Sequence, residues 1–185
     1  MGDWTSPLYI SSQVFVCIAY ALFAYTYFVK GRITVLTVTM IGNVAYGICY
    51  GFLFAWTGML LVGVALLRDI TSMVLYQKRP PEMRKRITRL DCWLLVLWFV
   101  LAGAVTAVSW AGWQSLFAML GTVLFTISIW QKNKVAYNFI GIAVSAVWII
   151  YNVYIESVFG FVLESVFLVM VVIGALTSLR QKGKL

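Results

Sequence analysis

The sequence contains no histidine and few charged residues. Asp, Glu, Lys and Arg make up 11% of its 185 residues, whereas they are about a quarter of a soluble domain. With 63% hydrophobic residues and a mean hydropathy of +0.94, the chain does not have the composition of a soluble globule. The absence of histidine excludes His-ligated haem, zinc sites built on histidine and every His-based catalytic dyad. We therefore expect no cofactor.

Cysteine is also scarce. The three cysteines, Cys17, Cys49 and Cys92, lie far apart in apolar sequence and form no C-x-x-C motif. We interpret them as small buried hydrophobic residues, with no metal or redox role.

Long apolar runs are abundant and predict seven transmembrane helices of about 20 residues each. The predicted spans are Leu8–Val29, Ile33–Phe54, Gly58–Gln77, Asp91–Trp110, Trp113–Trp130, Val135–Ile155 and Gly160–Leu179. The spans leave only short connections, so we expect an all-α, polytopic membrane protein with one membrane domain over residues 1–185. Continuous apolar runs of this length differ from the alternating segments of a β-barrel.

The basic residues lie on one side of this topology. Thirteen of the 14 Lys and Arg fall in the first, third and fifth loops and the C-terminal tail. The positive-inside rule then places the N-terminus outside and the C-terminus in the cytoplasm. The third loop, Lys78–Arg89, contains Pro80–Pro81, which end the third helix. Thr88 to Asp91 has the spacing of a capping box that opens the fourth. The net charge of +8 thus indicates a topology anchor and contact with the lipid bilayer, not nucleic acid.

The chain has a weak internal repeat. A shift of 102 residues aligns Val14–Arg79 with Leu116–Gln181 without a gap. The identical pairs are Phe15/Phe117, Leu22/Leu124, Phe23/Phe125, Lys30/Lys132, Ile48/Ile150, Gly58/Gly160, Leu61/Leu163, Val64/Val166 and Leu66/Leu168. The loops agree as well, because Lys78 falls on Arg180. We expect a 3-1-3 architecture with two parallel three-helix repeats, residues 8–79 and 113–181, joined by a linker helix, residues 91–110. The SWEET sugar carriers and PnuC vitamin carriers share this plan, and transporters commonly bind substrate near the midplane between repeats.

The second repeat resembles the YgjV-like bacterial inner membrane proteins. The resemblance is carried by L-G-T at Leu120–Thr122, W-I-I-Y-N at Trp148–Asn152 and S-x-x-G-x-x-x-E-x-x-F-L-x-M at Ser157–Met170, together with the mid-helix Arg68. Members of the family can carry Asn where this chain has Ala65. The resemblance implies a multi-pass protein of the bacterial inner membrane and no assigned activity.

Three charged residues lie well inside the predicted spans: Arg68, Asp69 and Glu164. Charges at this depth are costly and are candidates for a functional site. We predict that Arg68 and Glu164 face the bundle interior and share one polar cavity or a direct contact, with Asp69 able to compete for the arginine. Either a packing ion pair or a site for a ligand or coupling ion explains the three charges.

The preferred functional hypothesis is a carrier for a small metabolite, with its site between the repeats. In this hypothesis Arg68 holds an anionic or carbonyl group, and Glu164 and Asn152 form hydrogen bonds to the ligand. Trp148 and Tyr46 flank the ligand. Asn43 also contributes a polar group, and Asp69 or Glu164 couples protons.

A protein that assembles with other membrane proteins, or with itself, is the alternative. It requires a seam of small residues facing lipid, which Gly42, Gly47 and Gly51 offer on the second span. An enzyme is not expected, because the chain shows no arrangement of a nucleophile with a base.

Overall fold

A computed structural model describes residues 4–26, 32–85, 87–130 and 134–182, and within them it contains seven α-helices. The helices are α1 Pro7–Tyr25, α2 Arg32–Phe52, α3 Trp56–Lys78, α4 Arg89–Val108, α5 Gln114–Trp130, α6 Lys134–Tyr154 and α7 Val158–Lys182, with a short 3-10 helix, η1 Pro81–Lys85, between α3 and α4. The all-α prediction is confirmed, and each predicted span falls on one helix.

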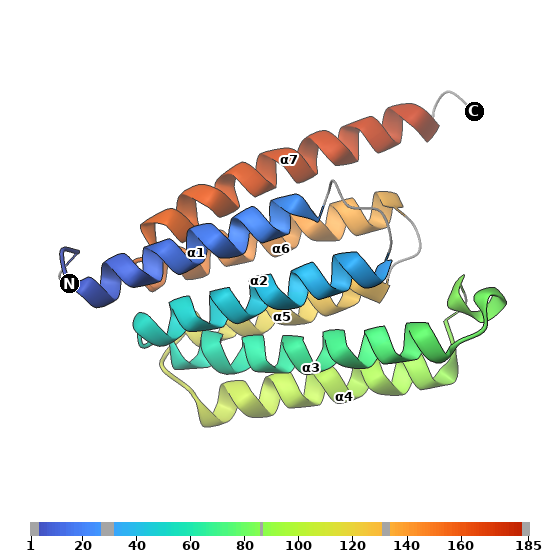
Figure 1. The fold of residues 1–185 in the computed structure, drawn as a ribbon, viewed down its shortest axis with the longest axis horizontal. Helices are drawn as coiled ribbons and strands as arrows, with labels where there is room; N and C mark the ends of the chain where they lie inside the picture. Colours follow the sequence, from blue (N-terminus) through green and yellow to red (C-terminus); the bar gives the residue numbers. More distant parts are fainter. Residues whose placement is uncertain (1–3, 27–31, 86, 131–133, 183–185) are drawn as a thin grey trace.

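Five of these helices are long and apolar enough to cross a membrane: α1, α2, α3, α4 and α7. The helix α5 has 17 residues, and the apolar described part of α6 runs from Asn138 to Tyr154. Successive helices run in opposite directions, and the N- and C-termini lie at opposite ends of the molecule (Figure 1). We call the end that carries the α3–α4 connection the basic end, because Lys78, Arg79 and Arg89 lie there.

Local signals account for several helix ends. Ser6 caps α1 by accepting a hydrogen bond from the Tyr9 N–H at 3.2 Å. The predicted capping box is confirmed, because Thr88 Oγ1 accepts from the Asp91 N–H and the Asp91 carboxylate accepts from the Thr88 N–H at 2.8 Å. Arg79 donates two hydrogen bonds to the same carboxylate, at 2.8 and 3.0 Å. The basic loop is therefore tied to the first turn of α4.

Some predicted boundaries were wrong by a few residues. The helix α1 is described to Tyr25, with Thr26 as its C-cap, whereas the predicted end of the first span at Val29 lies outside the described residues. The capping box starts α4 at Arg89 instead of Asp91. The aligned loop residues Lys30 and Lys132 lie outside the described residues.

Six helices form a closed ring. The neighbouring pairs around it are α1·α2, α2·α3, α3·α5, α5·α6, α6·α7 and α7·α1. The helix α4 lies outside this ring and packs on α3 and α5. The helices α2 and α6 lie on opposite sides of the ring, and their backbones are therefore not among the close pairs. Large buried side chains, including Tyr46, Tyr50 and Tyr151, occupy the space between them.

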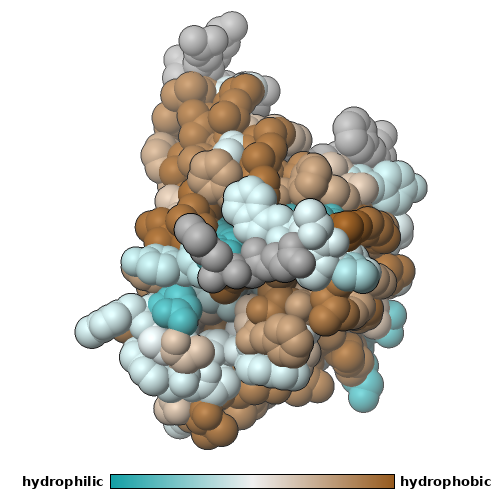
Figure 2. Space-filling model, turned by 90° about the vertical axis from the view of Figure 1, so that its left-hand side faces the viewer, coloured by the Kyte–Doolittle hydropathy of each residue, from teal (hydrophilic) through white to brown (hydrophobic). Residues whose placement is uncertain are grey.

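The outer surface of the helices is apolar. Val108 is 88% exposed and Trp93 is 73% exposed, and many other Leu, Ile, Val and Phe side chains are exposed along α4 and α7. An apolar surface of this extent is not stable in water and indicates contact with lipid. Figure 2 shows the end opposite the basic end, where pale and teal polar residues cross the middle of the face and brown hydrophobic residues predominate above, on the α7 side.

The α2–α3 and α6–α7 connections, at this opposite end, have the same backbone geometry. Phe54 has φ 54° and Glu156 has φ 55°, and these are the positive-φ residues other than glycine in the described chain. The following N–H groups bond back into the preceding helix, Ala55 to the Tyr50 carbonyl at 2.9 Å and Ser157 to the Asn152 carbonyl at 3.0 Å. In each connection the α-helix ends at a residue in the left-handed (αL) conformation, which is uncommon for residues with a Cβ.

Candidate functional site

A buried ionic cluster lies between α2, α3 and α5. Arg68 is 1% exposed, and its guanidinium donates from Nε to Asp69 Oδ1 at 2.9 Å and from Nη1 to Thr126 Oγ1 at 3.0 Å. The guanidinium carbon lies 5.0 Å from the centre of the Phe125 ring. Asn43 donates from Nδ2 to the other carboxylate oxygen of Asp69 at 3.1 Å. Arg68 and Asp69 therefore neutralise each other, and Thr126 and Asn43 supply further hydrogen bonds, although Arg68 Nη2 has an ion-pair contact with Asp69 and no hydrogen bond within the described residues.

A second polar cluster surrounds Glu164, between α1, α2, α6 and α7. Tyr20 donates a hydrogen bond from its hydroxyl to the Glu164 carboxylate, and the Ser145 hydroxyl also interacts with that carboxylate. The hydroxyls of Tyr20 and Tyr46 lie 3.2 Å apart, and Asn152 donates from Nδ2 to the Tyr46 hydroxyl at 3.3 Å. Four helices from both halves of the chain thus contribute to one hydrogen-bonded network.

The predicted contact between Arg68 and Glu164 is not formed. Both side chains are buried, but the arginine is paired with Asp69, the competitor that the sequence also offered. Neither of the two ion pairs among the described residues includes Glu164. Depth explains this result, because Arg68 lies 12 residues into α3 and Glu164 only six residues into α7, a difference of about 9 Å along the helices.

Aromatic side chains form a layer next to the Glu164 network. Tyr50 and Trp148 stack with ring centres 6.2 Å apart and planes inclined by 21°. Tyr151 meets both rings edge-on, with a centroid distance of 5.5 Å to each. Tyr46 lies 4.6 Å from the Tyr50 ring, which joins this layer to the hydrogen-bonded network. We call these four residues the aromatic layer.

The aromatic layer requires two close glycines. A Cβ on Gly58 of α3 would lie 2.5 Å from the Tyr151 hydroxyl and 2.9 Å from the Tyr50 ring. A Cβ on Gly121 of α5 would lie 2.9 Å from the Trp148 indole. Larger residues at these positions would force the rings to move, since both distances are shorter than ordinary van der Waals contact.

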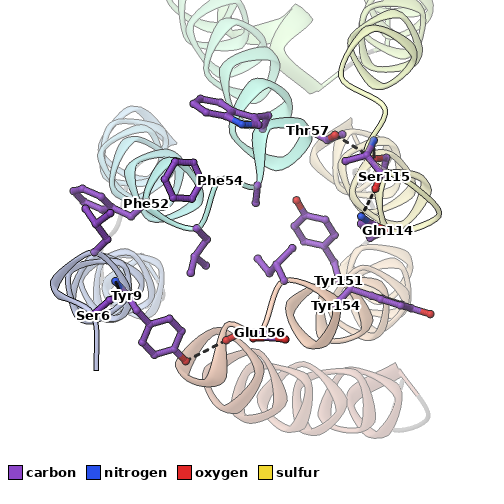
Figure 3. A pocket seen from close by; sticks show the side chains of 16 residues that line it. Ser6, Tyr9, Phe52, Phe54, Thr57, Gln114, Ser115, Tyr151, Tyr154 and Glu156 are labelled. Carbon is purple, nitrogen blue, oxygen red and sulfur yellow. Dashed lines mark hydrogen bonds between the residues drawn. The ribbon is translucent and has the colours of Figure 1, made fainter. Parts of the chain in front are cut away.

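A pocket opens at the end opposite the basic end. Its volume is about 510 Å³, and its lining comes from the start of α1 and from the α2–α3, α4–α5 and α6–α7 connections. Figure 3 shows Tyr151 reaching from α6 toward the middle of this pocket, while Tyr9 bonds to the Glu156 carbonyl at its edge. Tyr151 therefore belongs both to the pocket and to the aromatic layer. These rings lie between the pocket and the Glu164 network.

Among the described residues, three buried polar atoms in this region have no hydrogen-bond partner: the Asn152 side-chain oxygen and the hydroxyls of Tyr50 and Ser157. The side-chain oxygen of Asn152 has no hydrogen-bond partner, although the residue is only 1% exposed. Buried polar atoms are nearly always paired, so an orphan of this kind is a candidate ligand contact. Within the described ranges, no group of three or more His, Cys, Asp or Glu residues could hold a metal ion.

The structure distributes the predicted site residues over these two clusters. Glu164, Asn152, Tyr46 and Trp148 lie in the Glu164 network and the aromatic layer, whereas Arg68, Asp69 and Asn43 form the separate ionic cluster. The predicted site did not include Tyr20 or Tyr50. The four-residue spacing from Tyr46 to Tyr50 was the available signal, because it puts both rings on one face of α2.

The glycines of α2 do not form a seam facing lipid, contrary to the expectation for an assembly protein. A Cβ on Gly42 would lie 2.5 Å from the Phe23 ring of α1, and one on Gly47 would lie 3.3 Å from Val62 of α3. Gly51 faces Met59 of α3 at 3.4 Å. These glycines allow close packing within the chain.

One family model, Imp-YgjV, described as bacterial inner membrane protein, matches residues 10–182. No curated protein and no solved structure matches the chain.

Proposed function

The chain belongs to the Imp-YgjV family of bacterial inner membrane proteins, and from this premise we propose that it carries a small polar metabolite across that membrane. The observation that carries the proposal is the sequence of layers inside the helix ring. A pocket open at one end reaches Tyr151, and the aromatic layer separates the pocket from a buried hydrogen-bonded network around Glu164. Buried polar residues inside the hydrocarbon region commonly mark the path of a substrate or ion.

We further propose that α1–α3 and α5–α7 are two parallel repeats with α4 as the linker. The helices α2 and α6 both have 21 residues and start 102 positions apart, which is the offset of the sequence alignment. The left-handed residues Phe54 and Glu156 are separated by the same offset.

The two interfaces between the halves support the same repeat. On one side the Gln13 side-chain oxygen accepts from the Phe159 N–H at 3.0 Å. On the other side the Ser115 and Thr57 hydroxyls lie 3.2 Å apart. Residues 57 and 159 are equivalent in the alignment, and residues 13 and 115, one position before its start, are separated by the same 102 positions. A pseudo-twofold axis through the ring relates the two contacts, as in transporters with parallel repeats and in the 3-1-3 plan of SWEET and PnuC carriers.

In the proposed topology all seven helices cross the membrane, with the basic end in the cytoplasm. This follows from the positive-inside rule and from the alternating direction of the helices. The pocket then faces outside, and the aromatic layer closes the path toward the cytoplasm. Rocking of one three-helix unit against the other, at the α1·α7 and α3·α5 contacts, would open the site alternately to each side.

The competing proposal, an assembly protein without transport, has less support. Its small-residue seam on α2 is used for packing against α1 and α3. A scaffold also has no need for an open pocket above a buried hydrogen-bonded network.

Uptake into proteoliposomes tests the carrier proposal. The purified protein is reconstituted, and the vesicles are exposed to a ¹³C-labelled bacterial metabolite extract whose entry is measured by mass spectrometry. We expect at least one metabolite to enter vesicles with the parent protein and not protein-free vesicles, with entry lost in Asn152→Ala. Glu82→Gln, which changes an exposed residue of η1, is the matched control, and we expect it to retain uptake. Entry of no metabolite, with extract on either side of the membrane, would overturn the proposal.

A further inference from the structure

The buried charges of the helix ring do not balance. Three charged side chains lie inside it, and two of them, Arg68 and Asp69, form an ion pair 2.9 Å long. Glu164 is the third, is 8% exposed, and takes part in neither ion pair of the described residues. Among the side chains that the structure describes, the interior therefore has one acidic group without a cationic partner. A carboxylate removed from water is strongly disfavoured unless a proton or a cation accompanies it.

The Glu164 carboxylate accepts hydrogen bonds from the Tyr20 and Ser145 hydroxyls, and an unpaired acceptor and aromatic rings lie beyond them. The Asn152 side-chain oxygen has no donor, and this residue bonds to Tyr46 through its amide nitrogen. The hydroxyls of Tyr20 and Tyr46 can accept as well as donate. A ligand that carries N–H groups would satisfy the unpaired oxygen, whereas an anionic ligand would face a carboxylate and an unpaired acceptor.

The aromatic layer favours the same sign of charge. Tyr46, Tyr50, Trp148 and Tyr151 meet with ring centres 4.6 to 6.4 Å apart. Aromatic faces attract cations, and groups of such rings are the usual receptors for ammonium groups. Tyr151 lines the pocket (Figure 3), and its contact with Tyr50, and that of Tyr50 with Tyr46, place the layer between the pocket and the Glu164 network.

We propose that the substrate of this site is a small organic cation with a single positive charge, and that the Glu164 carboxylate is its counter-ion. This inference rests on the proposed carrier function. It replaces the sequence-based expectation that Arg68 holds an anionic group, because the Asp69 carboxylate already neutralises the guanidinium, whose Nη2 lies 2.9 Å from Asp69 Oδ1.

The charge preference of the pocket can be measured without knowing the substrate. Tyr151→Cys is made in a chain whose native cysteines are replaced by serine. It is then modified by two methanethiosulfonate reagents of similar size, one with a trimethylammonium group and one with a sulfonate. The rate of each reagent is divided by its rate with a free thiol. The cation preference is the normalised rate of the trimethylammonium reagent divided by that of the sulfonate reagent. Leu53→Cys, also in the pocket lining, is the second reporter if Tyr151→Cys does not fold.

The ratio is measured at pH 6.5 and at pH 8.5. At one of these pH values or both, we expect a cation preference above one, and we expect this preference to fall at least fourfold when Glu164→Gln is added. A fourfold change is about what a unit charge roughly 10 Å away in water produces for two probes of opposite sign. Glu82→Gln, the remote exposed control, leaves the ratio unchanged.

Two results would overturn the inference: a ratio that does not respond to Glu164→Gln at either pH, or one that responds only to Glu156→Gln at the pocket edge. Uptake of an anionic metabolite in the vesicle experiment would overturn the cation inference and leave the carrier function intact. A Glu164-dependent cation preference without uptake of any metabolite would overturn the carrier function and leave the cation preference of the site intact.

Discussion

The Tyr20 hydroxyl on α1 donates a hydrogen bond to the Glu164 carboxylate on α7, across one of the two interfaces that join the three-helix units. The residues are 144 positions apart in the chain. This bond connects the proposed substrate site with a contact that must change if the two units move against each other. The same bond is therefore a test of both packing and transport.

Removing either partner of this bond should destabilise the protein. We expect Tyr20→Phe and Glu164→Met to show a coupling energy of about 0.5–2 kcal/mol in a double-mutant cycle, since interhelical hydrogen bonds in membranes average less than 1 kcal/mol. Thermal or denaturant unfolding in detergent measures it. Additive effects of the two changes would mean that the bond does not form in the membrane protein.

The Arg68–Asp69 pair should behave as a unit that is independent of Glu164. Asp69→Asn leaves the arginine buried without a counter-charge and is expected to lower the free energy of unfolding by about 3–5 kcal/mol. The double change Arg68→Met with Asp69→Leu should recover most of this loss. Arg68→Met with Glu164→Met is the comparison, and it should not recover, because these residues are not paired. Recovery in the second double variant would show that Arg68 and Glu164 interact.

Gly58 and Gly63 of α3 provide a matched pair of glycines. Gly58→Ala places a methyl group against the Tyr151 hydroxyl and the Tyr50 ring, whereas a Cβ on Gly63 meets no atom within 4 Å. We expect Gly58→Ala to cost about 1–3 kcal/mol and to reduce uptake, because the aromatic layer must shift. Gly63→Ala should leave stability unchanged or raise it by up to about 1 kcal/mol through helix propensity. The unfolding free energies and uptake rates of the two variants are compared directly, and equal effects would contradict the described packing.

The orientation can be tested by labelling at the two ends of the ring. In a chain without native cysteines, Ala111→Cys in the α4–α5 connection should react with a membrane-impermeant thiol reagent applied from outside. Glu82→Cys in η1, exposed at the basic end, should react only after the membrane is permeabilised. The partition of Lys and Arg is the physical reason. The reverse labelling pattern would show that the protein has the opposite orientation, and equal labelling of both positions would contradict the seven-span arrangement.

The features that could be predicted from the sequence depend on neighbours in the chain. Apolar runs predicted all seven helices, and the capping box at Thr88 and Asp91 was predicted because its groups are three residues apart. The burial of Arg68 and Glu164 was also predictable, because a charge within an apolar span must avoid lipid. The partners of these charges were not predictable in the same way, since the long side chains of arginine and glutamate can reach several helices.

The sequence by itself determined that this chain is a multi-pass α-helical membrane protein with a basic end and three charges inside its spans, because length, hydropathy and the cost of a buried charge act residue by residue. Only the tertiary structure decided which charge is left without a partner. Closure of the ring through the α3·α5 and α1·α7 contacts brings Thr126 to Arg68 and Tyr20 to Glu164, whereas Asp69 is the next residue after Arg68 on α3. These pairings depend on helix rotation and depth, which are set by packing around glycines such as Gly58 and Gly121.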